Sequence, residues 1–183
     1  MRTPESAPLP DAVVFIAASV DGYIARLDGS LDWLPEADPE EDYGYATFMA
    51  TVDALVMGRK TYEVVRGFGG DWPYAGTPVV VLSHGQPILP EGAEVEVLAL
   101  SPADVLAVLG ARGARRVYVD GGQTLQAFLR AGLVRELTVT RIPVLLGDGI
   151  QLFGSLPADV ALTHVETQSF SSGLVQSRYR IVG

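Results

Sequence analysis

Two cations, Arg59 and Lys60, follow Gly58 directly at the end of the apolar run VDALV (52–56). The run is typical of a buried strand, and the residues after Gly58 are typical of the start of a helix. Backbone N–H groups at a helix start point outward, and the helix dipole attracts negative charge there. The stretch GRKT (58–61) therefore indicates a seat for an anion such as a phosphate group, although a cationic pair at a helix start is also typical of a solvated surface.

Three other predicted strand ends carry polar or glycine-rich sequences, which are Ser19-Val-Asp21-Gly22, Ser83-His84 and Asp120-Gly121-Gly122. In an open α/β sheet, ligands bind beyond the carboxyl ends of the strands. Two glycine-opened helix starts on neighbouring strands would suit a pyrophosphate, and Ser83 with His84 could hold a further phosphate on a ribose. Together these positions predict a nucleotide cofactor, whereas each glycine pair taken alone is also typical of a tight turn.

The elements that position these residues follow from hydrophobic periodicity. Apolar or alternating stretches predict strands at 12–18, 53–57, 77–83, 116–120, 135–146, 160–170 and 174–182. Amphipathic stretches predict helices after Gly58 and at 39–52, 101–113 and 121–133. Alternating strands and helices followed by consecutive strands predict an α/β fold. Its central sheet is mostly parallel, with helices on both faces and an antiparallel C-terminal hairpin at the edge.

Composition and charge limit the classes of function. The 183 residues, 48% of them hydrophobic, predict a flexible N-terminal lead at 1–11 and a single domain at 12–183. The net charge of −9 argues against nucleic-acid binding and against anionic membrane surfaces. Apolar runs of strand length and a start without an apolar signal segment predict a cytoplasmic protein. With no cysteine and two histidines, we expect no metal site.

From Val13 to Val182, the order of the motifs resembles the dihydrofolate reductase-like superfamily, which includes the reductase domain of the bifunctional riboflavin-biosynthesis protein. The resemblance rests on SVDGYIA (19–25), MGRKTYE (57–63), VYVDGGQTLQAFL (117–129) and LTVTRIPVLLGDGIQLF (137–153). It implies a three-layer sandwich and a reductase that uses NADPH. Ser83 and His84 would lie beside the adenosine 2′-phosphate. The implied cofactor-binding residues are Ala18, Gly58, Arg59, Lys60, Thr61, Ser83, His84, Gly121, Gly122, Gln123 and Thr124.

Hydride transfer to a C=N or C=O group leaves an atom that needs a proton. The resemblance implies Asp42 as the proton donor and Thr140 on a late strand as its partner, with Glu41 an equal alternative to Asp42. An acidic helix start would explain both carboxylates without catalysis. In the loop after the first strand, Asp21 is a further catalytic candidate, and Asp32 is an alternative as the essential carboxylate. That loop could close over the substrate and the nicotinamide.

Residues that the family has and this sequence lacks limit the class of substrate. The riboflavin-pathway reductases hold a ribose phosphate with basic residues, and the corresponding stretch FMATVDA (48–54) contains no arginine or lysine. We therefore expect a stand-alone reductase of a small heterocycle such as a pterin or an aminouracil. A non-catalytic pterin- or nucleotide-binding protein is the alternative, and a structural module is the third possibility. Related reductase domains pair through the segment equivalent to 144–153, so a homodimer is also expected.

Overall fold

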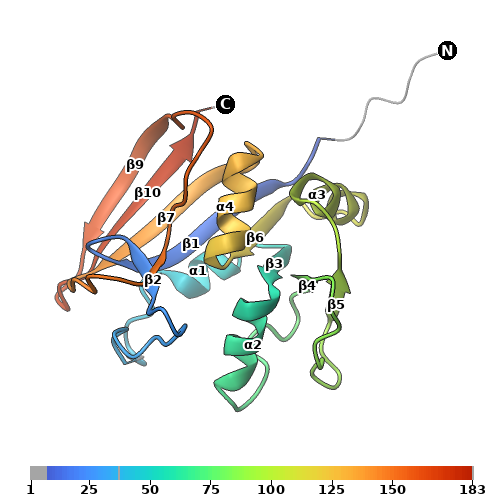
Figure 1. Cartoon of the computed structure of the whole chain (residues 1–183), viewed down its shortest axis with the longest axis horizontal. Coiled ribbons are helices and arrows are strands. Elements are labelled where there is room, and N and C mark those ends of the chain that lie inside the picture. Colours follow the sequence, from blue (N-terminus) through green and yellow to red (C-terminus); the bar gives the residue numbers. More distant parts are fainter. Residues whose placement is uncertain (1–7, 37, 183) are drawn as a thin grey trace.

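The computed structural model describes residues 8–36 and 38–182, in which eight strands form one sheet in the order β5-β4-β3-β6-β1-β7-β10-β9 (Figure 1). Its strands are β1 (Asp11–Ser19), β3 (Ala54–Gly58), β4 (Val79–Leu82), β5 (Val95–Leu98), β6 (Arg116–Asp120), β7 (Val134–Ile142), β9 (Leu162–Ser169) and β10 (Val175–Ile181). A second, two-stranded sheet pairs β2 (Tyr23–Ala25) with β8 (Ile150–Gln151). The helices are α1 (Tyr45–Met49), α2 (Arg59–Gly67), α3 (Pro102–Ala111) and α4 (Gly122–Arg130).

The large sheet is parallel from β5 to β7 and antiparallel at the edge formed by β10 and β9. Its parallel strands are rich in valine and are almost fully buried at β3, β4 and β6, as expected for a sheet covered on both faces. The β9–β10 hairpin and β5 lie at opposite sides of the molecule (Figure 1). The predicted α/β fold with an antiparallel C-terminal hairpin is therefore confirmed.

Two hydrophobic cores lie on the two faces of the sheet because alternate strand residues point to opposite sides. On one face, Val14, Val56 and Val119 pack with residues of α3 and α4, including Leu106 and Phe128. On the other face, strand side chains pack with α1 and α2; these residues include Val13, Leu55, Met57, Tyr118, Phe48 and Tyr62. The three-layer arrangement follows directly from this alternation.

Several boundaries differ from the sequence prediction. The helix expected at 39–52 begins only at Tyr45, because Tyr43 and Gly44 adopt the left-handed conformation with φ of 55° and 80°. The last part of the strand expected at 135–146 is missing, since β7 ends at Ile142. The strands β2, β5 and β8 were not predicted; they contain three, four and two residues, too few for a clear periodic pattern.

The N-terminal boundary also differs by one residue. Asp11 was assigned to the flexible lead, but it already belongs to β1 and pairs with Arg116 of β6. Residues 1–7 of that lead lie outside the described residues. Among the helices of the described chain, none has both the length and the apolarity needed to cross a membrane.

Candidate functional site

Two helices begin side by side at the carboxyl ends of neighbouring strands. β3 leads through Gly58 into α2, β6 leads through Gly121 into α4, and Met57 pairs with Asp120 in the sheet. In the described chain, neither helix start has a side-chain cap, whereas Ser101 caps α3. Uncapped first-turn amides and two helix dipoles therefore face the same edge of the sheet, an arrangement suited to a pyrophosphate.

The two glycines are required by close packing between these helix starts. A Cβ atom on Gly58 would lie 2.8 Å from Oγ1 of Thr124, and a Cβ atom on Gly121 would overlap Oγ1 of Thr61. Each glycine thus faces the threonine of the other helix. Gly121 also has a φ of 94°, which a residue with a side chain rarely adopts. The structure thus brings together four of the predicted cofactor-binding residues, Gly58, Thr61, Gly121 and Thr124.

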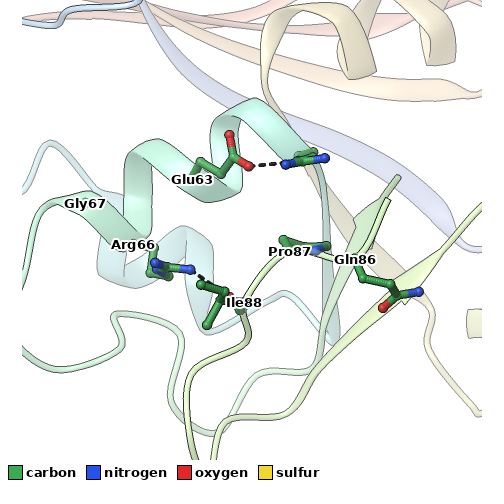
Figure 2. A pocket seen from close by; sticks show the side chains of 7 residues that line it. Glu63, Arg66, Gly67, Gln86, Pro87 and Ile88 are labelled. Carbon is green, nitrogen blue, oxygen red and sulfur yellow. Dashed lines mark hydrogen bonds and ion pairs between the residues drawn. The ribbon is translucent and has the colours of Figure 1, made fainter. Parts of the chain in front are cut away.

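A cavity of about 370 Å³ runs along α2 from its first to its last residue (Figure 2). Arg59, Glu63 and Arg66 line it from α2, and the segment 86–88 after β4 lines its other side. Nε of Arg59 donates to Oε1 of Glu63 at 2.7 Å, and Nη1 of Arg66 donates to the Ile88 carbonyl at 2.9 Å. Two guanidinium groups and one carboxylate therefore share one pocket.

The predicted residues after β4 also reach this region. The Ser83 hydroxyl accepts a hydrogen bond from the Gly85 amide at 3.0 Å. Nη1 of Arg59 lies so close to Gly85 that an added Cβ atom would be 2.7 Å away. Arg59 and Ser83 therefore both lie close to Gly85, while His84, Lys60 and Gln123 are exposed.

The end of β1 lies at the same edge of the sheet as the start of α4. Ala18 and Ser19 are fully buried, and the Ser19 hydroxyl accepts from the Tyr23 amide at 2.9 Å. That bond positions β2, whose Ile24 side chain lies where a Cβ atom on Gly122 would be. Ala18 and Gly122 consequently belong to the same buried wall at the carboxyl edge of the sheet.

The three predicted catalytic residues are not brought together by hydrogen bonds. The Asp21 carboxylate accepts from the amides of Leu146 and Gly147, at 3.1 and 2.8 Å, and so holds the loop after β7. Thr140 is buried and accepts from Gln176 at 2.9 Å. The expected pairing of Thr140 with Asp42 is absent.

Asp42 is engaged elsewhere. Its exposed carboxylate accepts from the amides of Ala46 and Gly44, at 2.8 and 2.9 Å, and these bonds hold the pKa of Asp42 below its usual value. Such a carboxylate stays ionised and caps the start of α1. Glu41 likewise accepts from the Tyr43 amide at 2.8 Å, and Asp32 pairs with Arg26 at 2.6 Å.

A different carboxyl group, that of Asp120, is in a buried environment that favours its protonated form. Burial raises its pKa to about 6, opposed mainly by the hydrogen bond that its Oδ1 accepts from the Gly121 amide at 2.8 Å. Its charge acts on the phenols of Tyr45, Tyr74 and Tyr118, because burial and then the charge of Asp120 raise the pKa of each, that of Tyr45 to about 12. An aspartate that ends an apolar strand just before two glycines was the sequence signal for this residue.

Comparisons with known proteins identify the family of the chain. The family model of the RibD C-terminal domain matches residues 10–176. The uncharacterized protein YwjB of Bacillus subtilis is 35% identical over 168 residues, which cover 91% of this chain and 95% of YwjB. A candidate riboflavin biosynthesis protein of Shewanella sp. PV-4 is 40% identical, with a TM-score of 0.87 over 94% of this chain and 99% of that one.

The fold also matches a larger enzyme. The deaminase/5-amino-6-(5-phosphoribosylamino)uracil reductase of Thermotoga maritima superposes with a TM-score of 0.73 at 16% identity. The match covers 95% of this chain and 57% of the Thermotoga protein. At that identity the likeness extends to the fold alone.

Proposed function

Since the chain belongs to the RibD C-terminal domain family, we propose that it is an NADPH-dependent reductase that transfers hydride to a small heterocyclic substrate. The observation that carries the proposal is the pair of uncapped helix starts behind Gly58 and Gly121. One helix start can receive one phosphate group, and two adjacent starts match the two phosphates of a dinucleotide. Their interlocking with Thr61 and Thr124 supports a preformed seat.

The remaining cofactor contacts follow from the positions around this seat. Lys60 and Arg59 supply positive charge at the first turn of α2, and Gln123 lies at the first turn of α4. Ser83 and His84, together with Arg59, would receive the adenosine 2′-phosphate. The nicotinamide would then lie along the wall that contains Ala18 and Gly122.

Asp120 is the side chain best placed to hold the proton that the reduced substrate needs. It lies at the carboxyl end of β6, immediately before the Gly121 seat. With a pKa of about 6, roughly a tenth of the Asp120 carboxyl groups are still protonated at pH 7, whereas Asp42 is ionised. The aromatic side chains around Asp120 would exclude water from a planar ring bound there.

The substrate proposed for this site is a heterocycle without a phosphate group. The segment 48–54 contains no basic residue, and in the structure it holds the end of α1 and the start of β3. A pterin or an aminouracil base fits an environment of phenols and one carboxyl group, because both carry hydrogen-bonding edges on a planar ring.

The first test is a titration of the purified protein with NADPH and NADH, followed by tryptophan fluorescence. We expect micromolar binding of NADPH, tighter than that of NADH. Lys60 is the only lysine in the chain, so its ¹³C-methylated amine gives one side-chain signal that should shift as NADPH binds. In Lys60→Ala, NADPH should bind about ten-fold more weakly, because one charge-assisted phosphate contact is lost.

The matched control is Arg130→Ala, which removes one exposed cation from the last turn of α4, at the far end from the seat. Its affinity for NADPH should equal that of the wild type. Absence of binding by either nucleotide would refute the proposal. Tight NADPH binding without oxidation in the presence of pterins and aminouracils would instead indicate a non-catalytic binding protein.

A further inference from the structure

The pocket beside α2 contains two kinds of group that recognise the adenosine ribose differently. Arg59, Glu63 and Arg66 are separated by four and three residues on α2 and line this pocket together with the segment 86–88. Figure 2 shows Arg66 directed at Ile88. A guanidinium group binds a 2′-phosphate, whereas a carboxylate accepts a hydrogen bond from a free 2′-hydroxyl. A pocket selective for the phosphate alone has no use for the carboxylate, which would repel it.

The three side chains differ in how firmly they are held. The Arg66 guanidinium is committed to the Ile88 carbonyl at 2.9 Å. The Arg59 guanidinium lies against Gly85, 2.7 Å from the place where a Cβ atom on that glycine would be. Its pairing with Glu63 is 2.7 Å long, yet the two side chains are 51% and 47% exposed.

An ion pair as exposed as this one contributes little to stability, so either partner can leave it at small cost. A 2′-phosphate would draw Arg59 away from Glu63 and leave the two anions close together. A 2′-hydroxyl would instead donate to Glu63 without disturbing its pairing with Arg59. The same pocket can therefore accommodate both forms of the ribose, with Glu63 favouring the unphosphorylated one.

We propose that Glu63 is a specificity-determining residue, whose carboxylate weakens NADPH and strengthens NADH so that the protein uses both dinucleotides. This inference rests on the proposed function, because it concerns the adenosine end of the same cofactor site. In the wild type, the dissociation constants of NADPH and NADH should then differ by no more than about ten-fold.

The test compares both nucleotides with the wild type, Glu63→Gln and Glu94→Gln by isothermal titration calorimetry. Glu63→Gln removes the repelling charge, so NADPH should bind several-fold tighter and NADH several-fold more weakly. The ratio of the two dissociation constants should change by about ten-fold. Glu94→Gln changes the net charge equally, but Glu94 lies immediately before β5, and its carbonyl accepts from the amide of Val79 at the amino end of β4. It should leave both constants unchanged.

The outcomes separate the two proposals. If the wild type binds neither nucleotide, the proposed function and the role of Glu63 both fail. If the wild type binds NADPH but Glu63→Gln leaves the ratio unchanged, only the role of Glu63 is refuted. If Glu94→Gln changed the ratio of the two dissociation constants equally, the effect would come from net charge, and the role of Glu63 would also be refuted. Circular dichroism of the exposed Glu63→Gln variant checks that the fold is intact.

Discussion

Burial raises the pKa of the Asp120 carboxyl group from 3.8 to about 6, and the charge of that group raises the pKa of the phenols of Tyr45, Tyr74 and Tyr118. Between pH 3.8 and about pH 6, the folded state therefore binds more protons at Asp120 than the unfolded state does. Stability must therefore fall as the pH rises through the interval between 3.8 and about 6. Above that interval, the ionised carboxylate costs the folded state up to about 3 kcal/mol.

Asp120→Asn should remove this part of the pH dependence, because an amide does not titrate. Its oxygen can still accept the hydrogen bond from the Gly121 amide. The free energy of unfolding of the variant, relative to the wild type, should increase by up to about 3 kcal/mol between pH 3.5 and pH 7.5. Urea denaturation across this range measures the difference.

Asp42→Asn is the matched control, since the pKa of Asp42 is lowered by its bonds to the Ala46 and Gly44 amides. The contribution of Asp42 to the free energy of unfolding should have the opposite pH dependence. The wild type should lose this contribution at low pH, whereas Asp42→Asn lacks it at every pH. Parallel curves for Asp120→Asn and the wild type would show that Asp120 is ionised like an ordinary carboxylate. In that case the group would be a poor proton donor.

At the scale of the elements, the interlocked starts of α2 and α4 depend on Gly121. Gly121→Ala should destabilise the protein by about 3 kcal/mol, because the methyl group would meet Thr61 and the backbone has a φ of 94°. The NADPH affinity of the folded variant should also fall, since the two amide clusters would move apart. Urea denaturation and nucleotide titration measure these two effects.

Gly132→Ala separates strain from packing. Gly132 follows the other end of α4 with a φ of 67°, and a Cβ atom there would have no neighbour within 4 Å. This variant should lose about 1 kcal/mol through backbone strain and should bind NADPH as the wild type does. Equal losses in the two variants would mean that the contact between the helix starts contributes nothing.

The same elements show what could be predicted from sequence and what could not. Gly58 ends the apolar strand β3 and Gly121 follows β6, so the place of both glycines at the carboxyl edge of the sheet could be predicted from local pattern. The surroundings of Asp120 could not be predicted in full, because Tyr118 shares its strand but Tyr45 and Tyr74 come from other segments. Asp42 was misjudged as part of a helix, since a capping aspartate and an acidic first turn look alike in sequence.

At the scale of the whole molecule, the carboxyl ends and the amino ends of the parallel strands carry different groups. The proposed cofactor seat lies at the carboxyl ends of β3 and β6, whereas the ion pair of Arg116 with Glu136 lies at the amino ends of β6 and β7. That pair is 2.7 Å long, and its side chains are 27% and 11% exposed. Arg116 also donates to the hydroxyl of Thr51, so it links β6 to the chain before β3.

Glu136→Gln should therefore reduce stability without changing cofactor affinity. Loss of the charge leaves the largely buried guanidinium of Arg116 with a neutral partner, which should cost about 2 kcal/mol in the free energy of unfolding. Glu166→Gln breaks the pair with Arg178 in which Glu166 is 66% exposed, and it should cost less than about 0.5 kcal/mol. Both variants should bind NADPH like the wild type in the absence of urea, because the seat depends on local contacts between Gly58, Gly121 and their threonines. A ten-fold weaker NADPH affinity in folded Glu136→Gln would show instead that the two edges are coupled through β6, and that the seat is not set by its local packing alone.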